Sequence, residues 1–396
     1  AKRCMMKQKK AVRNLIDPDF IEQGKTIGII GGGQLGQMMA LSAKYGGMKV
    51  ITLDPTPDCP CGQVADKQIV AEYSDVKAIE ELAKESDVLT YEFENVDLQA
   101  LKDVADKVKI PQGTNLLYIT KHRLREKNFL RSAGCMTAPY LPVKNMADLK
   151  EAIKKIGYNC VLKTCEGGYD GHGQEVLKSD ADLKNNAHIK EILATGDCIL
   201  EGWVPFKVEA SVMVARNAKG EVTVFPVSEN YNADEILHIS IVPARVSKEI
   251  YAKAQAIAKQ IAEAIHLRGI LGVELFILDN GDIYVNELAP RPHNSGHYSI
   301  EACNFDQFDI HDRAICNWPL PKIKLLSKVV MVNVLGQHVA GVRKVIPEKS
   351  NWHFHYYGKA EIRHNRKMGH VTILTDDIEK TLQEINDTHI WKTKVN

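Results

Sequence analysis

Two glutamates near residue 280 are spaced so that together they could bind a metal ion. Asn280-Gly281 separates two alternating runs, VELFIL and IYVNEL, which predicts a hairpin with a two-residue turn. Such a turn pairs residues whose numbers sum to 561, so Glu274 is expected opposite Glu287. Carboxylates about 5 Å apart repel each other unless a cation lies between them. Mg²⁺ prefers oxygen ligands and completes its shell with substrate phosphates, so the pair indicates a nucleotide site.

The alternative for this pair is a solvated face of the sheet. Four apolar residues are expected to share the face of the two glutamates, namely Phe276, Leu278, Ile283 and Val285. The carboxylates would then end an otherwise apolar surface. We therefore favour the metal site over the solvated face.

A lysine and a glycine-rich loop could hold the phosphates of that nucleotide. Lys163 lies in the apolar strand CVLKT, and GGYDGHG follows at residues 167–173. A buried lysine needs a partner, and a glycine-rich loop lets backbone N–H groups close on phosphate oxygens. A hairpin over a triphosphate fits both features. The alternative is an ordinary glycine-rich hairpin whose lysine reaches out to solvent.

The next segment could hold the nucleoside. The strand CILEG leads through Trp203, Val204 and Pro205 into a strand that carries Glu209. An adenine needs one backbone donor and one backbone acceptor beside an apolar wall, and a ribose needs a carboxylate. The connector at residues 201–204 could supply the first requirement and Glu209 the second.

The N-terminal part carries a second glycine-rich motif. TIGII at residues 26–30 predicts a buried strand, and GGGQLG at 31–36 opens a predicted helix, which matches GxGxxG. The strand KVITLD then ends in Asp54, where a dinucleotide fold would hold a ribose. The motif indicates a Rossmann-like half. Either it binds a phosphate, as in an NAD-dependent oxidoreductase, or its glycines serve only a tight turn and close packing.

Other charged residues are candidates because of their expected position. VLTYEFENV, residues 88–96, predicts a strand whose end presents Glu92 and Glu94 to a ligand crevice. TKHRLREKNFLRSAG predicts a basic helix that contains Arg123 and ends at Gly134. A basic cluster precedes VTIL near the C-terminus, namely Lys359, Arg363, Arg366 and Lys367. It is either solvated surface or a phosphate site that faces the N-terminal crevice.

Length and composition restrict the class of protein. The 396 residues predict two or three domains, and 44% hydrophobic with 26% charged residues predicts a globular chain. A net charge of +1 gives no general attraction to nucleic acid or membranes, and no apolar run is long enough for a membrane span. Nine scattered cysteines indicate reduced thiols and a cytoplasmic location. Residues 1–24 are expected to form a poorly ordered leader.

Six motifs taken together resemble one family. GGGQLGQMM, YEFENV, GYDGHGQ, EGWVPF, NELAPRPHNSGH and RKMGH are similar to the ATP-grasp ligases, and within them to the 5-(carboxyamino)imidazole ribonucleotide synthetases of purine biosynthesis. The resemblance runs from about Gly24 to the C-terminus. It implies an α/β fold of the ATP-grasp type, with a Rossmann-like domain (25–120), an ATP-grasp domain (121–322) whose mobile lid covers about 137–205, and a small β-rich C-terminal domain (323–396). It also implies a homodimer.

The resemblance further implies a role for each matching residue. ATP would be held by Arg123, Lys163, Gly168, Tyr169, Asp170, Gly171, His172, Gly173, Gln174, Glu201, Gly202, Trp203, Val204, Glu209, Asn232, Asn286 and Glu287. Magnesium would be held by Glu274 and Glu287. The catalytic residues would be Lys163, Arg291, His293 and Asn294, the last three surrounding bicarbonate together with Ser295. Aminoimidazole ribonucleotide would be bound by Gln34, Leu35, Glu94, Ser295, Lys359 and Arg366. Asn232 departs from the family pattern, because relatives often carry a histidine there.

The implied reaction is the ATP-dependent carboxylation of aminoimidazole ribonucleotide with bicarbonate, through carboxyphosphate. A closed site would protect that labile intermediate from water. Three alternatives remain at this stage. The chain could be another ATP-grasp ligase, such as a formate-using glycinamide ribonucleotide transformylase or a biotin carboxylase. It could also be an NAD-dependent oxidoreductase or a nucleotide sensor without turnover.

Overall fold

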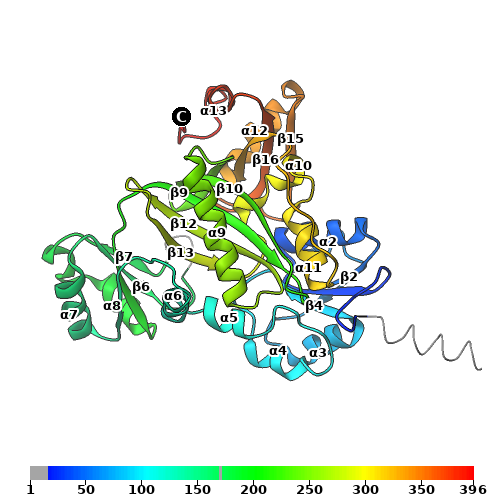
Figure 1. Cartoon of the computed structure of the whole chain (residues 1–396), viewed down its shortest axis with the longest axis horizontal. Helices are drawn as coiled ribbons and strands as arrows, with labels where there is room; N and C mark the ends of the chain where they lie inside the picture. Colours follow the sequence, from blue (N-terminus) through cyan, green and yellow to red (C-terminus); the bar gives the residue numbers. More distant parts are fainter. Residues whose placement is uncertain (1–16, 169–171) are drawn as a thin grey trace, which may run out of the picture.

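The computed structural model describes residues 17–168 and 172–396, and Tyr169, Asp170 and Gly171 lie outside the described residues. Three β-sheets organise this part of the chain (Figure 1). A parallel sheet forms the N-terminal domain, an antiparallel sheet of eight strands runs through the middle, and a small antiparallel sheet forms an arm at the left of the view. The expected α/β architecture is confirmed.

The N-terminal sheet has the strand order β3-β2-β1-β4, with all strands parallel. Its elements are β1 (Thr26–Ile30), α2 (Gln34–Tyr45), β2 (Lys49–Asp54), β3 (Lys67–Val70), α3 (Val76–Glu85), β4 (Val88–Tyr91) and α4 (Leu98–Val104). The apolar strand β1 is buried from Ile27 onward, because helices cover both faces of a parallel sheet. Strand β4 ends at Tyr91, earlier than the sequence predicted, so Glu92 and Glu94 follow the strand.

The arm lies within the expected lid, residues 137–205, and its strand order is β5-β8-β6-β7. Its elements are β5 (Tyr140–Val143), α7 (Met146–Ile156), β6 (Cys160–Thr164), β7 (Gln174–Leu177), α8 (Ala187–Ala194) and β8 (Cys198–Gly202). Two helices precede the arm, α5 (Asn115–Thr120) and α6 (Arg123–Ser132). Helix α6 ends as predicted, since Gly134 has the positive φ of +83° that suits a helix C-terminus.

The central sheet has the order β13-β12-β9-β10-β11-β14-β16-β15. Its strands are β9 (Phe206–Arg216), β10 (Val222–Ala233), β11 (Ile236–Val242), β12 (Gly269–Leu278), β13 (Ile283–Ala289), β14 (Lys328–Leu335), β15 (Trp352–Tyr356) and β16 (Lys367–Thr375). The C-terminal strands therefore continue the ATP-grasp sheet through the β11–β14 pair and do not form a sheet of their own.

Helices cover this central sheet. They are α9 (Lys248–Ala264), α10 (Ser299–Ala302), α11 (Gln307–Ile315), α12 (Val339–Val345) and α13 (Ile378–Asp387). Helix α9 begins where the Ser247 side chain accepts the Ile250 N–H, and it buries a face of small residues that includes Ala254 and Ala258. Figure 1 shows α9 lying across the strands of the sheet.

The expected leader is partly wrong. Residues 17–24 pack against the folded body, with Ile21 buried and its N–H donating to Cys316 O at 2.9 Å. The Trp318 indole donates to Ile21 O at 2.7 Å. The short apolar pair in DPDFIEQG was the available signal for this contact. Residues 1–16 lie outside the described residues.

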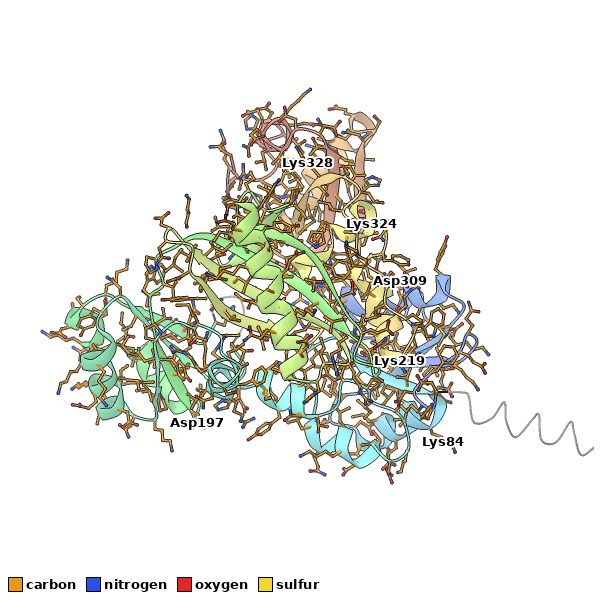
Figure 2. The ribbon with its side chains drawn as sticks, viewed as in Figure 1. Lys84, Asp197, Lys219, Asp309, Lys324 and Lys328 are labelled. Atoms are coloured by element: carbon orange, nitrogen blue, oxygen red, sulfur yellow. The ribbon has the colours of Figure 1, made fainter. Side chains whose placement is uncertain are left out.

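Charged side chains cover the outer surface. Figure 2 labels Lys84 on the N-terminal domain, Asp197 on the arm and Lys328 on the C-terminal strands, and all three are exposed. Among the helices of the described residues, none is long and apolar enough to cross a membrane.

Candidate active site

The hairpin that joins β12 and β13 has a different turn from the predicted one. The N–H of Leu278 donates to Asp282 O at 2.9 Å, so three residues, 279–281, form the loop. Gly281 takes the positive φ of +86° that such a loop requires. Ile277 pairs with Ile283, and residue numbers near the turn sum to 560. The two-residue turn was therefore wrong.

A β-bulge restores the predicted carboxylate pair. The register shifts between Glu274 and Leu275, and Asn286 is the extra residue on β13. Beyond the bulge the numbers sum to 561, and Glu274 lies opposite Glu287. The pairing predicted from the sequence is confirmed, although it arises from a longer loop and a bulge that compensate each other.

The bulge also changes which residues share the face of the glutamates. Phe276 pairs with Tyr284 on that face, whereas Ile283 and Val285 point to the opposite side and are buried in the core against α9. The prediction that Ile283 and Val285 accompany the glutamates was wrong, because one extra residue reverses every side chain between the bulge and the turn. The apolar neighbour of the glutamates on their face is Phe276, which stacks on Phe206 with ring centroids 4.8 Å apart.

Two buried residues of α6 hold the bulge in place. The Lys127 ammonium donates to Asn286 O at 2.7 Å, and the Leu288 N–H donates to the Glu126 carboxylate at 3.2 Å. Both charged side chains are about 2% exposed. They therefore clamp β13 on either side of Glu287. Burial, together with the charge of Glu287, raises the pKa of Glu126 well above its ordinary range.

The Glu274–Glu287 pair is short of positive charge. Burial, the charge of Glu287 and a shared hydrogen bond with it raise the pKa of Glu274 to about 8. Two basic groups stand near the pair, with Arg123 Nη1 3.9 Å from Glu287 and His293 Nε2 3.5 Å from Glu274. Both distances exceed those of a charge-assisted hydrogen bond, about 2.7–2.9 Å. Two facing carboxylates with this deficit of positive charge fit a divalent cation with oxygen ligands.

Glu201 has the opposite surroundings. Its carboxylate accepts a hydrogen bond from Lys163 Nζ at 2.7 Å and lies 3.9 Å from Lys127 Nζ. Burial alone would raise its pKa, but the two lysines outweigh burial and lower it to about 2. Lys163 of β6 thus forms an ion pair with Glu201, and this carboxylate is the partner that a buried lysine requires.

The glycine-rich loop between β6 and β7 closes near this pair. The N–H of Thr164 donates to Gly173 O at 2.9 Å, and Gly173 has a φ of +75°. Arg123 reaches the loop, with Nη2 3.5 Å from Gly168 O. His172 belongs to the described part of the loop, and Gln174 Nε2 donates to Glu235 at 3.0 Å. Arg123 and Lys163 therefore flank the part of the loop next to the strands.

The connector after β8 favours one donor for an adenine. The N–H groups of Gly202 and Trp203 are bonded within the protein, to Pro139 O and Asn159 O, each at 2.8 Å. This leaves Val204, which is buried, as the favoured donor of the expected set. Farther along β9, Glu209 has a pKa raised by burial and accepts a hydrogen bond from Asn232 Nδ2 at 2.7 Å. Asn232 stands where relatives were expected to carry a histidine. It thus orients Glu209, the residue expected to bind the ribose.

The segment after β13 links the two halves of the site. Arg291 Nη2 lies 2.9 Å from Glu94 Oε1 of the N-terminal domain. His293 Nδ1 lies 2.7 Å from Ser295 Oγ, which accepts a hydrogen bond from Ser211 at 2.6 Å. Burial, with a smaller contribution from Arg291, lowers the pKa of His293 to about 3, so the imidazole is neutral at pH 7. This supports a positioning role for His293.

Asn294 is engaged inside the fold. Its amide exchanges two hydrogen bonds with Asn333 of β14, at 2.9 and 2.6 Å. Asn333 also donates to Leu237 O at 2.7 Å. These contacts tie the loop after β13 to the C-terminal strands, so the side chain expected beside bicarbonate is held by a neighbouring amide.

The N-terminal glycine motif is filled by the protein's own carboxylates. The N–H groups of Gly33 and Gly36 donate to the two oxygens of Glu92 at 2.6 and 2.7 Å. Gly32 N–H donates to Asp54 at 2.8 Å. A pyrophosphate cannot occupy amides that already hold a carboxylate, so the NAD reading is wrong. The glycines permit close packing, since a Cβ on Gly31 would lie 2.3 Å from Glu92 Cγ.

A cavity of about 280 Å³ opens beside this motif, between the N-terminal and C-terminal domains. Its lining includes Gly33 and the side chains of Asp54, Lys359, Arg363 and Arg366. Burial, with smaller contributions from Arg366 and Lys367, lowers the pKa of Lys359 to about 8. The basic cluster therefore faces the N-terminal crevice, the arrangement expected for binding a phosphate.

Gln34 and Leu35 stand next to the cavity residue Gly33. Both are half-buried at the start of α2, and Leu35 also packs against the core. The expected substrate residues thus divide into a cavity group, Lys359 and Arg366, and a linking group, Glu94 and Ser295, beside Arg291 and His293.

Comparisons with known proteins agree on one family. Family models match residues 24–121 as a ribonucleotide synthetase preATP-grasp domain, 128–308 as an ATP-grasp domain and 329–384 as a phosphoribosylaminoimidazole carboxylase C-terminal domain. The N5-carboxyaminoimidazole ribonucleotide synthase of Bacillus subtilis strain 168 is 48% identical over 375 residues, which cover 95% of this chain and 97% of that protein. The chain belongs to this family. The N5-carboxyaminoimidazole ribonucleotide synthase of Staphylococcus aureus strain COL is 46% identical over 363 residues, or 91% of this chain and 96% of that protein.

Solved structures of N5-carboxyaminoimidazole ribonucleotide synthetases share the fold. An ADP complex has a TM-score of 0.92 and 51% identity, covering 95% of this chain and 99% of that chain. The Aspergillus clavatus enzyme with ADP and 5-aminoimidazole ribonucleotide has a TM-score of 0.86 and 31% identity, covering 93% and 98%. The chain is therefore an ATP-grasp ligase of the N5-carboxyaminoimidazole ribonucleotide synthase family, whose reaction belongs to purine biosynthesis.

Sequence reasoning missed two charged residues of this synthase fold, Glu126 and Lys127. The sequence predicted helix α6 only as a basic helix that contains Arg123. Its buried stripe consists of Glu126, Lys127 and Leu130, so charges occupy positions that are usually apolar. The spacing of Lys127 four residues after Arg123 and three before Leu130 was the available signal.

Proposed function

We propose that the chain carboxylates 5-aminoimidazole ribonucleotide with bicarbonate and ATP, and that the residues above divide the work between two adjoining sites. The observation that carries this proposal is the ion pair of Arg291 and Glu94, at 2.9 Å. Arg291 follows the carboxylate hairpin of the ATP-grasp domain, and Glu94 follows β4 beside the cavity-lining glycine motif. The pair joins the place where ATP reacts to the place where the amine is held.

The phosphates of ATP would lie between Lys163, Arg123 and the described part of the loop at Gly168. These cations stabilise charge on the phosphoryl group as it passes to bicarbonate. Val204 and Glu209 would hold the adenine and the ribose. Glu274 and Glu287 would hold Mg²⁺, which supplies charge neutralisation for the phosphates when it is bound. Tyr169, Asp170 and Gly171 remain expected ligands that lie outside the described residues.

Bicarbonate and the carboxyphosphate formed from it would lie near Arg291, where a guanidinium can bind an anion with two N–H groups. Neutral His293, fixed by Ser295, would orient this group, and Asn294 would fix the loop through Asn333. The phosphate of the ribonucleotide would bind Lys359 and Arg366, with Gln34 and Leu35 at the cavity edge. The exocyclic amine would then accept the carboxyl group.

We also propose a homodimer, as the family resemblance implies, and a cytoplasmic location. The eight cysteines in the described part of the chain are all free thiols. This usage supports a reducing compartment.

The decisive experiment measures magnesium-dependent ADP release with bicarbonate, with and without aminoimidazole ribonucleotide. Strong stimulation by the ribonucleotide in the wild type, lost in Glu287→Ala, is expected. Glu249→Ala, at an exposed glutamate of α9, is the matched control and should keep the stimulation. Equal slow hydrolysis with and without the ribonucleotide would reject this acceptor. Formate in place of bicarbonate tests the transformylase alternative, and an increase with formate alone would favour it.

A further inference from the structure

Three side chains of types that can bind metals converge between α10, β15 and β16, elements that Figure 1 shows close together. Glu301, His355 and His370 each offer one ligand atom, and these atoms lie within 4.8 Å of one another. His355 Nε2 lies 3.0 and 3.3 Å from the two oxygens of Glu301. None of the three residues lines the ribonucleotide cavity. The cluster therefore lies outside that cavity.

The strand register directs both imidazoles to one face. His355 and His370 are direct cross-strand partners on β15 and β16, and their rings stack with centroids 4.2 Å apart and planes 11° apart. Parallel rings do not aim their lone pairs at one point, so one imidazole must tilt to share an ion with the other. The terminal torsion of histidine has a broad energy well, so this adjustment costs little.

One ring nitrogen of His370 is unpaired. Nδ1 lies 2.7 Å from the hydroxyl of the buried Tyr357, while Nε2 is buried and has no hydrogen-bond partner in the described part of the chain. A buried polar atom without a partner is costly. Histidines that bind metals usually bond their second nitrogen to a neighbouring group, which fixes the ring and its tautomer. In this chain Tyr357 is the group that Nδ1 of His370 contacts, so Nε2 is left for a ligand.

The surroundings keep the histidine ready to bind. Burial, with the neighbouring His297 and His355, holds the pKa of His370 well below its ordinary value. The His297 ring also packs on His370, with centroids 4.8 Å apart, and His297 belongs to the same loop as His293.

We propose that Glu301, His355 and His370 form a second metal site, which takes a divalent transition metal such as Zn²⁺ and ties the C-terminal strands to α10. Two imidazoles and one carboxylate suit Zn²⁺, Ni²⁺ or Cu²⁺, whereas Mg²⁺ prefers oxygen ligands. Three protein ligands leave a fourth position for water. The chain would then hold two chemically distinct cations, Mg²⁺ at the β12–β13 hairpin and a transition metal here.

The test is zinc binding by the full chain after removal of metal with a chelator. Equilibrium dialysis against Zn²⁺ followed by metal analysis should find one tightly bound ion per chain in the wild type. Glu301→Gln and His355→Ala should each weaken binding at least tenfold. Zinc at a hundred times the wild-type Kd should raise the thermal midpoint of the wild type by roughly 4 °C, and the same zinc concentration should raise it by about half as much or less in both variants.

His188→Ala is the matched control. His188 pairs with Glu175 at 2.6 Å on the arm, and within residues 17–168 and 172–396 this imidazole and carboxylate belong to no cluster of three metal-binding groups, so the loss of His188 should leave zinc binding unchanged. Co²⁺ in place of Zn²⁺ separates this site from cysteine sites, because thiolate ligands add an intense charge-transfer band. Glu301→Gln keeps the size of the side chain, and its thermal midpoint without zinc checks the fold. Equal zinc affinity in all variants, a thiolate band, or no binding by the wild type at about 100 μM would each overturn the proposal.

Discussion

Glu201 and the Glu274–Glu287 pair belong to the same proposed nucleotide site but are neutralised in opposite ways. Glu201 lies against the ammonium groups of Lys163 and Lys127, at 2.7 and 3.9 Å, and its pKa falls to about 2. Glu274 faces another carboxylate, and its pKa rises to about 8. Where the chain supplies the cation, the carboxylate is permanently ionised and structural. Where the chain supplies a second carboxylate instead, the fold favours a proton on Glu274, and the proposed magnesium ion would replace that proton.

Glu92 shows a third way to accommodate a buried carboxylate. It receives the N–H groups of Gly33 and Gly36 at 2.6 and 2.7 Å, at the start of α2. Helix N-termini stabilise anions, and here the anion is part of the protein. The same glycine pattern that binds a phosphate in other proteins is therefore structural in this one, because a glutamate fills it.

The largest expected effect comes from removing the cation between Glu201 and the bulge. Lys127→Met should lower the free energy of unfolding by about 3 kcal/mol, because it leaves a buried carboxylate with one partner fewer and Asn286 O without its donor. It should also weaken magnesium binding, since the bulge positions Glu287. Thermal unfolding measures the first effect. Isothermal titration calorimetry with Mg²⁺ measures the second, and faster hydrogen exchange at Leu288 reports the loosened bulge.

Lys154→Met is the matched control for this change. Lys154 pairs with Glu151 at 2.7 Å, but both side chains are exposed, and such surface pairs contribute little. Its thermal midpoint and its hairpin exchange should match the wild type. If Lys127→Met behaved like Lys154→Met, the clamp by α6 would be ruled out.

A smaller effect is expected at the internal anion. Glu92→Gln should destabilise the protein by about 2 kcal/mol, because an amide group replaces one of the two oxygens that accept glycine N–H groups. Hydrogen exchange at Gly33 and Gly36 should accelerate. Glu80→Gln, at an exposed glutamate of α3, should change neither quantity. Unchanged exchange in Glu92→Gln would mean that the carboxylate does not hold the motif.

Local patterns predicted most elements of the fold. Strand β1, strand β2 and helix α2 follow directly from the apolar run and glycine punctuation at residues 26–54. The pairing of Glu274 with Glu287 was also predicted, yet the faces of Ile283 and Val285 were not. A bulge depends on what packs behind the strand, here Lys127 and Glu126, and these contacts span about 160 residues of sequence.

The sequence also could not predict that Glu92 fills the glycine motif, because this too depends on contacts between distant parts of the chain. Glu92 was expected to face a ligand from the end of a strand, whereas β4 ends one residue before it. Whether its carboxylate meets a ligand or the amides of Gly33 and Gly36 depends on how β1 and β4 lie side by side. That neighbour relation is a property of the sheet order, which residue patterns do not specify.

The smallest expected effect is a pH dependence of stability that the Glu274–Glu287 pair should show and Glu201 should not. The ordinary pKa of a glutamate is 4.5, and the fold raises that of Glu274 to about 8. Between these values Glu274 is protonated in the folded chain and ionised in the unfolded chain. Without metal, its contribution to the free energy of unfolding should therefore fall as the pH rises from about 4.5 to 8. Magnesium needs both carboxylates ionised. Its stabilising shift of the thermal midpoint should therefore grow over the same interval.

Glu274→Gln separates this effect from all other titrations. The amide cannot ionise, so the metal-free midpoint should lose this part of its pH dependence and the magnesium shift should disappear. Glu263→Gln, at an exposed position of α9, should keep both. Glu201 should contribute nothing in this interval, because its pKa of about 2 keeps it ionised throughout. A magnesium shift that is independent of pH would mean that Glu274 is already ionised without metal, and the contrast between the two carboxylate environments would then be lost.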